Sequence, residues 1–94
     1  MKEMKFDVKC VKDCLVKYGM VFSVRKWKSY NVNEVVMVKD VGVCEKLRVC
    51  EVRGIGDIMR FVELSGFSNV GEWWNKVKSF GAQDGWLYRI RVIQ

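Results

Sequence analysis

Apolar residues recur every three to four positions near the start of the chain, which is the spacing of one buried helix face. These positions are Val8, Val11, Cys14 or Leu15, and Tyr18. Gly19 follows them, and glycine readily takes the left-handed conformation with which many helices end. We therefore expect a helix over residues 8–18, with Asp7 as its N-cap and Lys5–Asp7 as a short lead-in strand.

Strict alternation replaces this spacing from Met20 onward, which is the pattern of a strand with two different faces. One face is apolar and we expect it to pack on the core; it carries Met20, Phe22 and Val24. The opposite face is mixed and we expect it to be exposed; it carries Val21, Ser23, Arg25 and Trp27.

Further strands are expected over residues 34–39, 43–53 and 85–92, with a turn at Asp40–Gly42. A short helix should cover residues 57–64, with Asp57 as its cap. A longer helix should begin at Asn69, which can form a capping box with Glu72. The apolar stripe of that helix should face the core; it comprises Val70, Trp73, Trp74, Val77 and Phe80.

Together these elements predict a single α+β domain over residues 1–94. Helices and strands do not alternate regularly, which argues against a doubly wound parallel sheet. We expect a small, curved, mostly antiparallel, β-barrel-like sheet with about three flanking helices. No apolar run approaches the roughly 18 residues of a membrane span, so we expect a cytoplasmic protein without a membrane partner.

Positive charge is concentrated in the first third of the chain. Residues 1–30 carry eight Lys or Arg against three Asp or Glu, whereas the other 64 residues carry nine against eight. A basic surface on one part of a small domain favours a polyanionic partner. The alternative is that these lysines only solvate the surface.

The chain has no histidine, threonine or proline. Histidine is the commonest general base and metal ligand, so we predict no catalytic residue, no metal site and no cofactor. Cys10 and Cys14 should share a helix face, whereas Cys44 and Cys50 should share a strand face at a separation of about 20 Å, too far for a zinc site. We expect buried free thiols, with a disulfide from helix to strand as the alternative.

The stretch from Gly19 to Lys28 is the candidate binding surface. An arginine and a tryptophan on one strand face can hold a phosphate and stack on a base. The candidate nucleic-acid-binding residues are Lys17, Ser23, Arg25, Lys26, Trp27 and Lys28, with Arg89 and Arg91 of the last strand as a second wall. Single-stranded or looped RNA is the expected partner.

This order of pieces resembles the ASCH domains, which belong to the PUA-like superfamily of small RNA-associated β-barrels. The resemblance rests on a helix that ends in glycine, followed by a strand that runs to Arg25. Three later segments are similar to the C-terminal half of compact archaeal-type members: Val62–Ser68, Glu72–Trp74 and Trp86–Arg89. The resemblance implies the barrel fold and a nucleic-acid cleft.

The family motif, Gly-x-Lys-x-x-Glu-x-Arg, is incomplete in this chain. Counted from Gly19, Val21 and Val24 stand at the lysine and glutamate positions. Lys26 stands at the arginine position, unless a deletion of one residue places Arg25 there. The family branch that hydrolyses modified cytidine uses Lys, Thr and Glu, so the resemblance does not extend to that activity.

Two other functions remain open from the sequence. A protein-interaction module or homodimer could pair an exposed strand, with Val21 and Leu87 in the interface. A hydrolase acting on RNA or on a modified nucleoside could use Ser23, Lys17 and Glu63.

Overall fold

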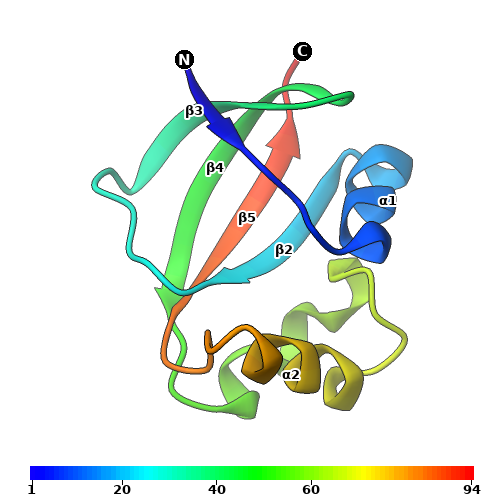
Figure 1. The fold of residues 1–94 in the computed structure, drawn as a ribbon, viewed down its shortest axis with the longest axis vertical. Helices are drawn as coiled ribbons and strands as arrows, with labels where there is room; N and C mark the ends of the chain where they lie inside the picture. The colour runs from blue at the N-terminus through cyan, green and yellow to red at the C-terminus, as the bar shows by residue number, and fades with distance from the viewer.

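The computed structural model describes residues 1–94 as an α+β fold built on one five-stranded sheet (Figure 1). In chain order the elements are β1 (Lys2–Met4), α1 (Lys9–Tyr18), β2 (Met20–Arg25), β3 (Asn33–Val38), β4 (Gly42–Glu51), the 3₁₀ segments η1 (Ile55–Asp57) and η2 (Met59–Leu64), α2 (Val70–Ser79) and β5 (Trp86–Val92). The strand order is β1-β3-β4-β5-β2, with only β1 and β3 parallel. The predicted α+β class and mostly antiparallel sheet are confirmed, and the sheet is open because β1 and β2 do not pair.

The sheet is covered on both faces at β2 and at the start of β5. The inner face, which carries Tyr88 and Ile90, packs against α1 in one cluster. The outer face, which carries Leu87, packs against η2 and α2 in a second cluster. Leu87 and Tyr88 are adjacent in β5, and both are fully buried. The short chain therefore builds two small cores that share one central strand.

This double burial overturns the predicted orientation of β2. Val21 is fully buried and Ser23 is only 9% exposed, because both lie on the inner face opposite Ile90 and Tyr88. Phe22 packs on the outer face, where its ring centroid lies 4.7 Å from that of Phe61 in η2. Alternation separated the two faces of β2 correctly, but the mixed face is covered as well. A dimer interface through Val21 and Leu87 is therefore wrong, since neither residue is exposed.

A β-bulge in β4 reassigns its second half to the other face. Arg48 lies opposite Tyr88 and Cys50 lies opposite Leu87, so Val49 is the extra residue. Cys44 consequently packs in the inner cluster and Cys50 against the outer one, and the prediction that they share a face is wrong. All four cysteines are free thiols, and burial raises the pKa of Cys14, Cys44 and Cys50.

The helix ends follow the sequence in part. Gly19 has a φ of 73° and its N–H donates to Leu15 O, and Asn69 Oδ1 accepts from the N–H of Glu72, both as predicted. Asp7 does not cap α1, whose N-cap is Val8. Asp57, expected to cap a helix over residues 57–64, lies at the end of η1. Its carboxylate accepts from the N–H groups of Arg53 and Gly54, so it fixes the turn that leaves the sheet.

Three further expectations about exposure and strand position are wrong. Tyr18 and Phe80, expected on the buried stripes of their helices, are 59% and 55% exposed because each stands at a helix end, beyond the packed turns. The lead-in strand lies at Lys2–Met4 rather than Lys5–Asp7, where β3 offers it a pairing partner. Trp73, by contrast, is buried in the outer cluster as expected.

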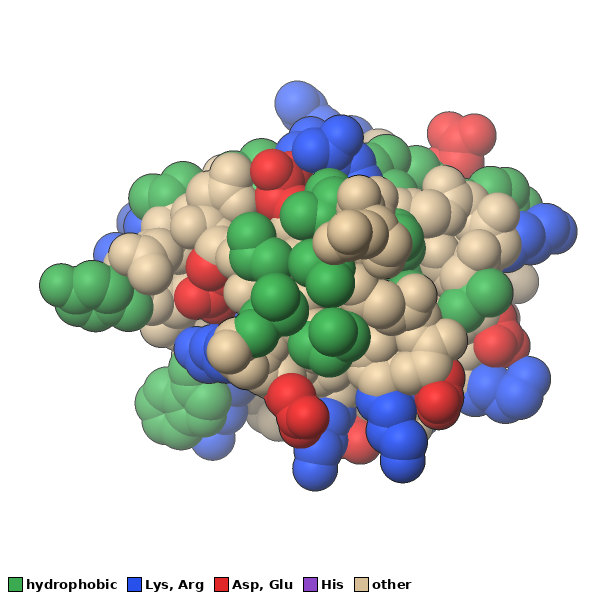
Figure 2. Space-filling model, turned by 90° about the horizontal axis from the view of Figure 1, so that it is seen from above, with side chains coloured by type: hydrophobic (Ala, Val, Ile, Leu, Met, Phe, Trp, Pro, Cys, Tyr) green, Lys and Arg blue, Asp and Glu red, His purple; other side chains and the backbone are tan.

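Hydrophobic side chains gather at the centre of the face that carries both chain termini, and charged side chains surround them (Figure 2). None of the helices is long and apolar enough to cross a membrane. The residues likewise form no group of three or more His, Cys, Asp or Glu that could hold a metal ion.

The contact between α1 and Gly66 gives a test of this packing. Gly66 has a φ of +89°, and a Cβ there would lie 2.6 Å from Cys10 O and 2.9 Å from Val11 Cα. Gly81 also has a positive φ, of +68°, but a Cβ there would meet nothing within 4 Å. We expect Gly81→Ala to lower the free energy of unfolding by about 1 kcal/mol, and Gly66→Ala by about 3 kcal/mol or more. Urea unfolding measures both, and equal losses would contradict the close packing of α1 on Gly66.

Candidate functional site

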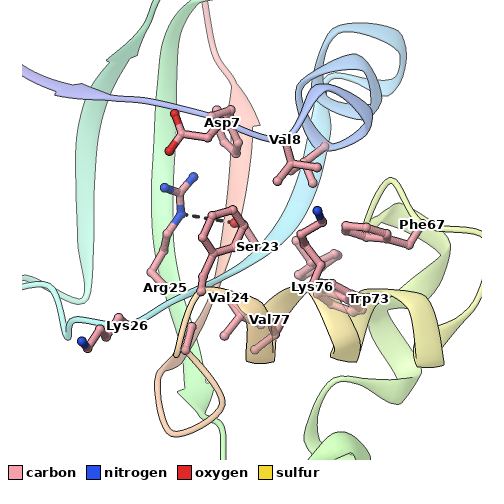
Figure 3. A pocket seen from close by; sticks show the side chains of 15 residues that line it. Asp7, Val8, Ser23, Val24, Arg25, Lys26, Phe67, Trp73, Lys76 and Val77 are labelled. Carbon is pink, nitrogen blue, oxygen red and sulfur yellow. Dashed lines mark hydrogen bonds between the residues drawn. The ribbon is translucent and has the colours of Figure 1, made fainter.

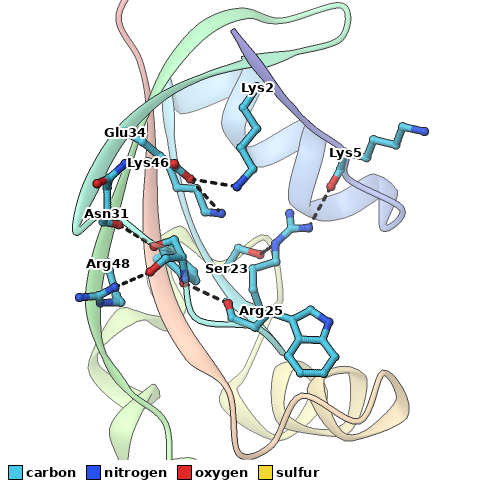
Figure 4. Close-up of polar contacts among 11 residues, drawn as sticks. Lys2, Lys5, Ser23, Arg25, Asn31, Glu34, Lys46 and Arg48 are labelled. Carbon is cyan, nitrogen blue, oxygen red and sulfur yellow. Dashed lines mark hydrogen bonds and ion pairs between the residues drawn. The ribbon is translucent and has the colours of Figure 1, made fainter.

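The inner face of the sheet changes from apolar to polar along its length. At the end covered by β1 and α1 it carries Val21, Val36 and Ile90. Toward the loop over residues 26–32 it carries a row of polar side chains, in which Ser23, Tyr88 and Arg48 lie side by side on β2, β5 and β4. Lys46 and Glu34 face each other on β4 and β3 next to this row. Figure 4 shows Lys2 and Lys46 meeting Glu34 within the curve of the sheet, with Arg48 farther out on β4.

Tyr88 ties the loop over residues 26–32 to this face. Its ring is fully buried, and its hydroxyl accepts from the N–H of Ser29 at 2.6 Å and donates to Trp27 O at 3.1 Å. Arg48 donates to Ser29 O at 2.7 Å, which fixes the same loop from β4. The loop after β2 is therefore held at its base, while the side chain of Trp27 remains 76% exposed.

Arg25 joins the two edges of the open sheet. Its Nε donates to Ser23 Oγ at 3.2 Å, and one terminal nitrogen donates to Lys5 O at 3.0 Å, in the segment that follows β1. The guanidinium also lies 4.8 Å from the ring centroid of Phe6. Burial lowers the pKa of Arg25, with Asp7 opposing that shift, but a guanidinium keeps its proton at neutral pH. Arg25 is thus a fixed positive charge inside the curve of the sheet.

Lys46 is the second cation within this curve, and it is incompletely neutralised. Its Nζ lies 3.6 Å from Glu34 Oε1, and Lys2 Nζ lies 3.8 Å from the same oxygen. Both distances are longer than a good hydrogen bond. Burial lowers the pKa of Lys46, and the charges of Lys2 and Arg25 lower it further, whereas Glu34 raises it. Glu34 is the only carboxylate that forms an ion pair with Lys2, Arg25, Lys46 or Arg48, which leaves an excess of positive charge.

Aromatic rings accompany these cations. Lys46 Nζ lies 4.5 Å from the ring centroid of Tyr88. Lys28 Nζ and the Arg48 guanidinium lie 4.9 Å and 5.5 Å from that of Trp86. Lys26 Nζ lies 5.1 Å from the exposed ring of Trp27. The arrangement can hold phosphates and can offer a planar surface to an unstacked base.

The structure brings five of the predicted binding residues together at this end of the molecule. Ser23 and Arg25 lie on the inner face, and the exposed side chains of Lys26, Trp27 and Lys28 follow directly in the loop. Arg89 and Arg91 lie on the outer face instead. They share Glu45, at 2.9 Å and 3.2 Å, so they do not form a second wall beside Arg25. Hydrogen bonds from Asn33 and Arg89 lower the pKa of Glu45.

Lys17 lies apart from this group, at the end of α1. It lines a shallow hollow with Glu63 and Tyr18, whereas Ser23 lines a different hollow beside β2. Of the three residues that a hydrolase could have used, Lys17 and Glu63 therefore share a hollow and Ser23 lies apart from them.

Sequence reasoning missed Lys46, Arg48 and Tyr88. Lys46 and Arg48 alternate with Glu45 and Leu47, so neither face of β4 is clearly apolar and the pattern does not show which face is covered. The two-residue alternation of a strand could have grouped these residues, because it places Cys44, Lys46 and Arg48 on one face of β4 as far as the bulge.

Comparisons with protein-family models, with curated proteins and with solved structures find no match to this chain. The case for function therefore depends on the geometry alone.

Removal of the Tyr88 hydroxyl should loosen the loop. In Tyr88→Phe the buried N–H of Ser29 loses its acceptor, so we expect the free energy of unfolding to fall by about 1–3 kcal/mol and the Ser29 amide to exchange faster. Tyr30→Phe is the matched control, because Tyr30 is 96% exposed and should change neither quantity. Urea unfolding and amide hydrogen exchange make the comparison. Unchanged exchange at Ser29 in Tyr88→Phe would show that this hydroxyl does not hold the loop.

Proposed function

We propose that this chain binds single-stranded or looped RNA along the inner face of its sheet and the loop over residues 26–32. One observation carries the proposal: Arg25 and Lys46 lie inside the curve of the sheet, Arg48 holds the loop that carries the exposed Trp27, and Glu34 is the only carboxylate paired with these cations. A polyanionic ligand binds where the positive charges of a protein are not all neutralised by its own carboxylates.

The cations would contact phosphates. A guanidinium has five N–H donors, and Arg25 and Arg48 each use only part of theirs on neighbouring oxygens. The remaining donors and the exposed ammonium group of Lys28 would contact phosphate oxygens, and Lys46, whose side chain is 13% exposed, would add its charge from beneath. Contacts of this kind carry no sequence information, so we expect broad specificity and an affinity that falls with salt.

Trp27 would supply the contact to a base. An exposed tryptophan held at its backbone offers a flat surface at a small cost in conformational freedom, because Tyr88 already fixes Trp27 O. Stacking of one base on an aromatic ring contributes about 1–3 kcal/mol. This preference for unstacked bases favours single strands and loops over duplexes.

The proposal extends to the fold family. The open, curved sheet is consistent with a PUA-like barrel of the ASCH type, in which the gap between β1 and β2 is bridged by Arg25 and Lys5 O. The helix that ends at Gly19 and the order α2 then β5 support the same assignment. Such a module would act inside the cell, where RNA is found.

Two matched double variants test the RNA proposal. Trp27→Ala/Lys28→Gln removes one aromatic ring and one lysine from the proposed surface. Tyr18→Ala/Lys17→Gln removes the same two kinds of group from the end of α1, where Lys17 Nζ lies 5.2 Å from the Tyr18 ring centroid. Titration with a fluorescent oligouridine at about 50 mM and about 200 mM salt measures affinity and its salt dependence.

The first variant should bind about tenfold to a hundredfold more weakly, and its salt slope should fall by about 0.7 because one phosphate contact is lost. The second should bind within about twofold of the parent chain, since its changes lie outside the surface. An affinity that does not change with salt, or equal losses in both variants, would refute the proposal.

A further inference from the structure

β2 is an edge strand whose outward backbone groups are partly unpaired. It pairs only with β5. Val92 N–H donates to Gly19 O, and antiparallel pairing alternates, so Val21, Ser23 and Arg25 direct their backbone groups toward β5. Met20, Phe22 and Val24 therefore direct theirs outward. The Cys14 thiol, 3.7 Å from Met20 O, agrees with this phase.

No hydrogen bond occupies the outward groups of Phe22 and Val24. Neither residue takes part in any backbone bond outside the ladders, nor in any side-chain bond to the backbone. The free stretch ends at Arg25, which is the last residue of β2 and directs its own backbone groups toward β5. Two residues with free N–H and C=O groups thus remain, enough to pair a short extended segment.

Phe22 and Val24, which carry the free N–H and C=O groups, line an apolar hollow between β2 and α2. The hollow measures about 210 Å³ and is closed by Val8, Phe67, Trp73, Val77 and Phe80, among others (Figure 3). Pockets that enclose whole small molecules measure about 300–1,000 Å³. The smaller volume suits one or two side chains of a longer chain lying across the opening.

The rim of the hollow is positively charged. Arg25, Lys26 and Lys76 line it, against Asp7 alone. A segment that carries Asp or Glu beside its apolar residue would complement this rim, whereas a basic segment would be repelled.

We propose that the free edge of β2 docks an extended, acidic segment of a protein partner by adding it as a further strand. Its backbone pairs with Phe22 and Val24, an apolar side chain enters the hollow above Trp73, and acidic neighbours face Lys26 and Lys76. The mode is β-strand addition, in which main-chain bonds supply affinity and the pocket supplies selectivity. This surface shares Arg25 and Lys26 with the proposed RNA surface, whereas Trp27, Lys28 and Lys46 do not line the hollow.

Selection from a displayed library of random seven-residue peptides tests the proposal on the full chain. Enriched peptides should combine a large apolar residue with Asp or Glu. A synthetic enriched peptide should slow amide hydrogen exchange at Phe22 and Val24, which a ligand confined to the hollow would leave unchanged. Lys76→Glu should weaken that peptide about tenfold, and Lys78→Glu, a matched reversal at an exposed position of α2, should change its affinity by less than about twofold.

Four outcomes would overturn the inference: no enrichment over the background, enriched peptides without acidic residues, binding without protection of Phe22 and Val24, or equal effects of the two lysine reversals. Protection of these amides by oligouridine instead would assign the edge to nucleic acid. Because Trp27→Ala/Lys28→Gln leaves the hollow intact, a chain that fails the RNA titration can still pass this test, and the reverse also holds.

Discussion

The burial of β5 on both faces at Leu87 and Tyr88 is the constraint on which the rest of the structure depends. Leu87 and Tyr88 are neighbours in sequence and are both fully buried, one against η2 and α2 and the other inside the curve of the sheet. A chain of this length has little apolar surface to divide between two cores, so each core is small. The inner core is filled at one end only, and the other end is left to polar residues.

This division explains why charged side chains lie within the fold. Arg25 and Lys46 occupy inner-face positions that a larger core would fill with apolar residues, and they are held by Ser23, Lys5 O and Glu34 instead. One carboxylate cannot balance the cations around it, and the loop fixed by Tyr88 places an exposed tryptophan beside them. The same edge of the sheet leaves the outward groups of Phe22 and Val24 free, because α2 packs beside β2 without adding a strand. Both proposed binding surfaces therefore follow from an incomplete closure between β1 and β2.

The sequence predicts the elements well where the signal is local. The apolar spacing before Gly19, the cap at Asn69 and the alternation in β5 all depend on neighbours within a few residues, and each is confirmed.

The sequence predicts burial poorly where burial depends on residues that are distant along the chain. Alternation shows that Phe22 and Val21 lie on opposite faces, but only the folded structure, with η2 on one face and α1 on the other, shows that both are covered. The bulge at Val49 likewise depends on pairing with β5, and it decides that Arg48 faces inward while Cys50 does not. Five of the site residues were found because they are contiguous; Lys46, Arg48 and Tyr88 were not, because they come from two strands that meet only in the folded sheet.

We propose above all that the inner face and the loop after β2 form one surface for RNA. The most direct measurement is an NMR titration of the labelled chain with a short oligouridine, followed at backbone amides and at arginine side chains. We predict shifts that concentrate at Arg25, Arg48, Lys46 and residues 26–32, with Arg89, Arg91 and Lys17 unchanged. Shifts that concentrate at Arg89 and Arg91 on the outer face, or no shifts at saturating RNA, would contradict it.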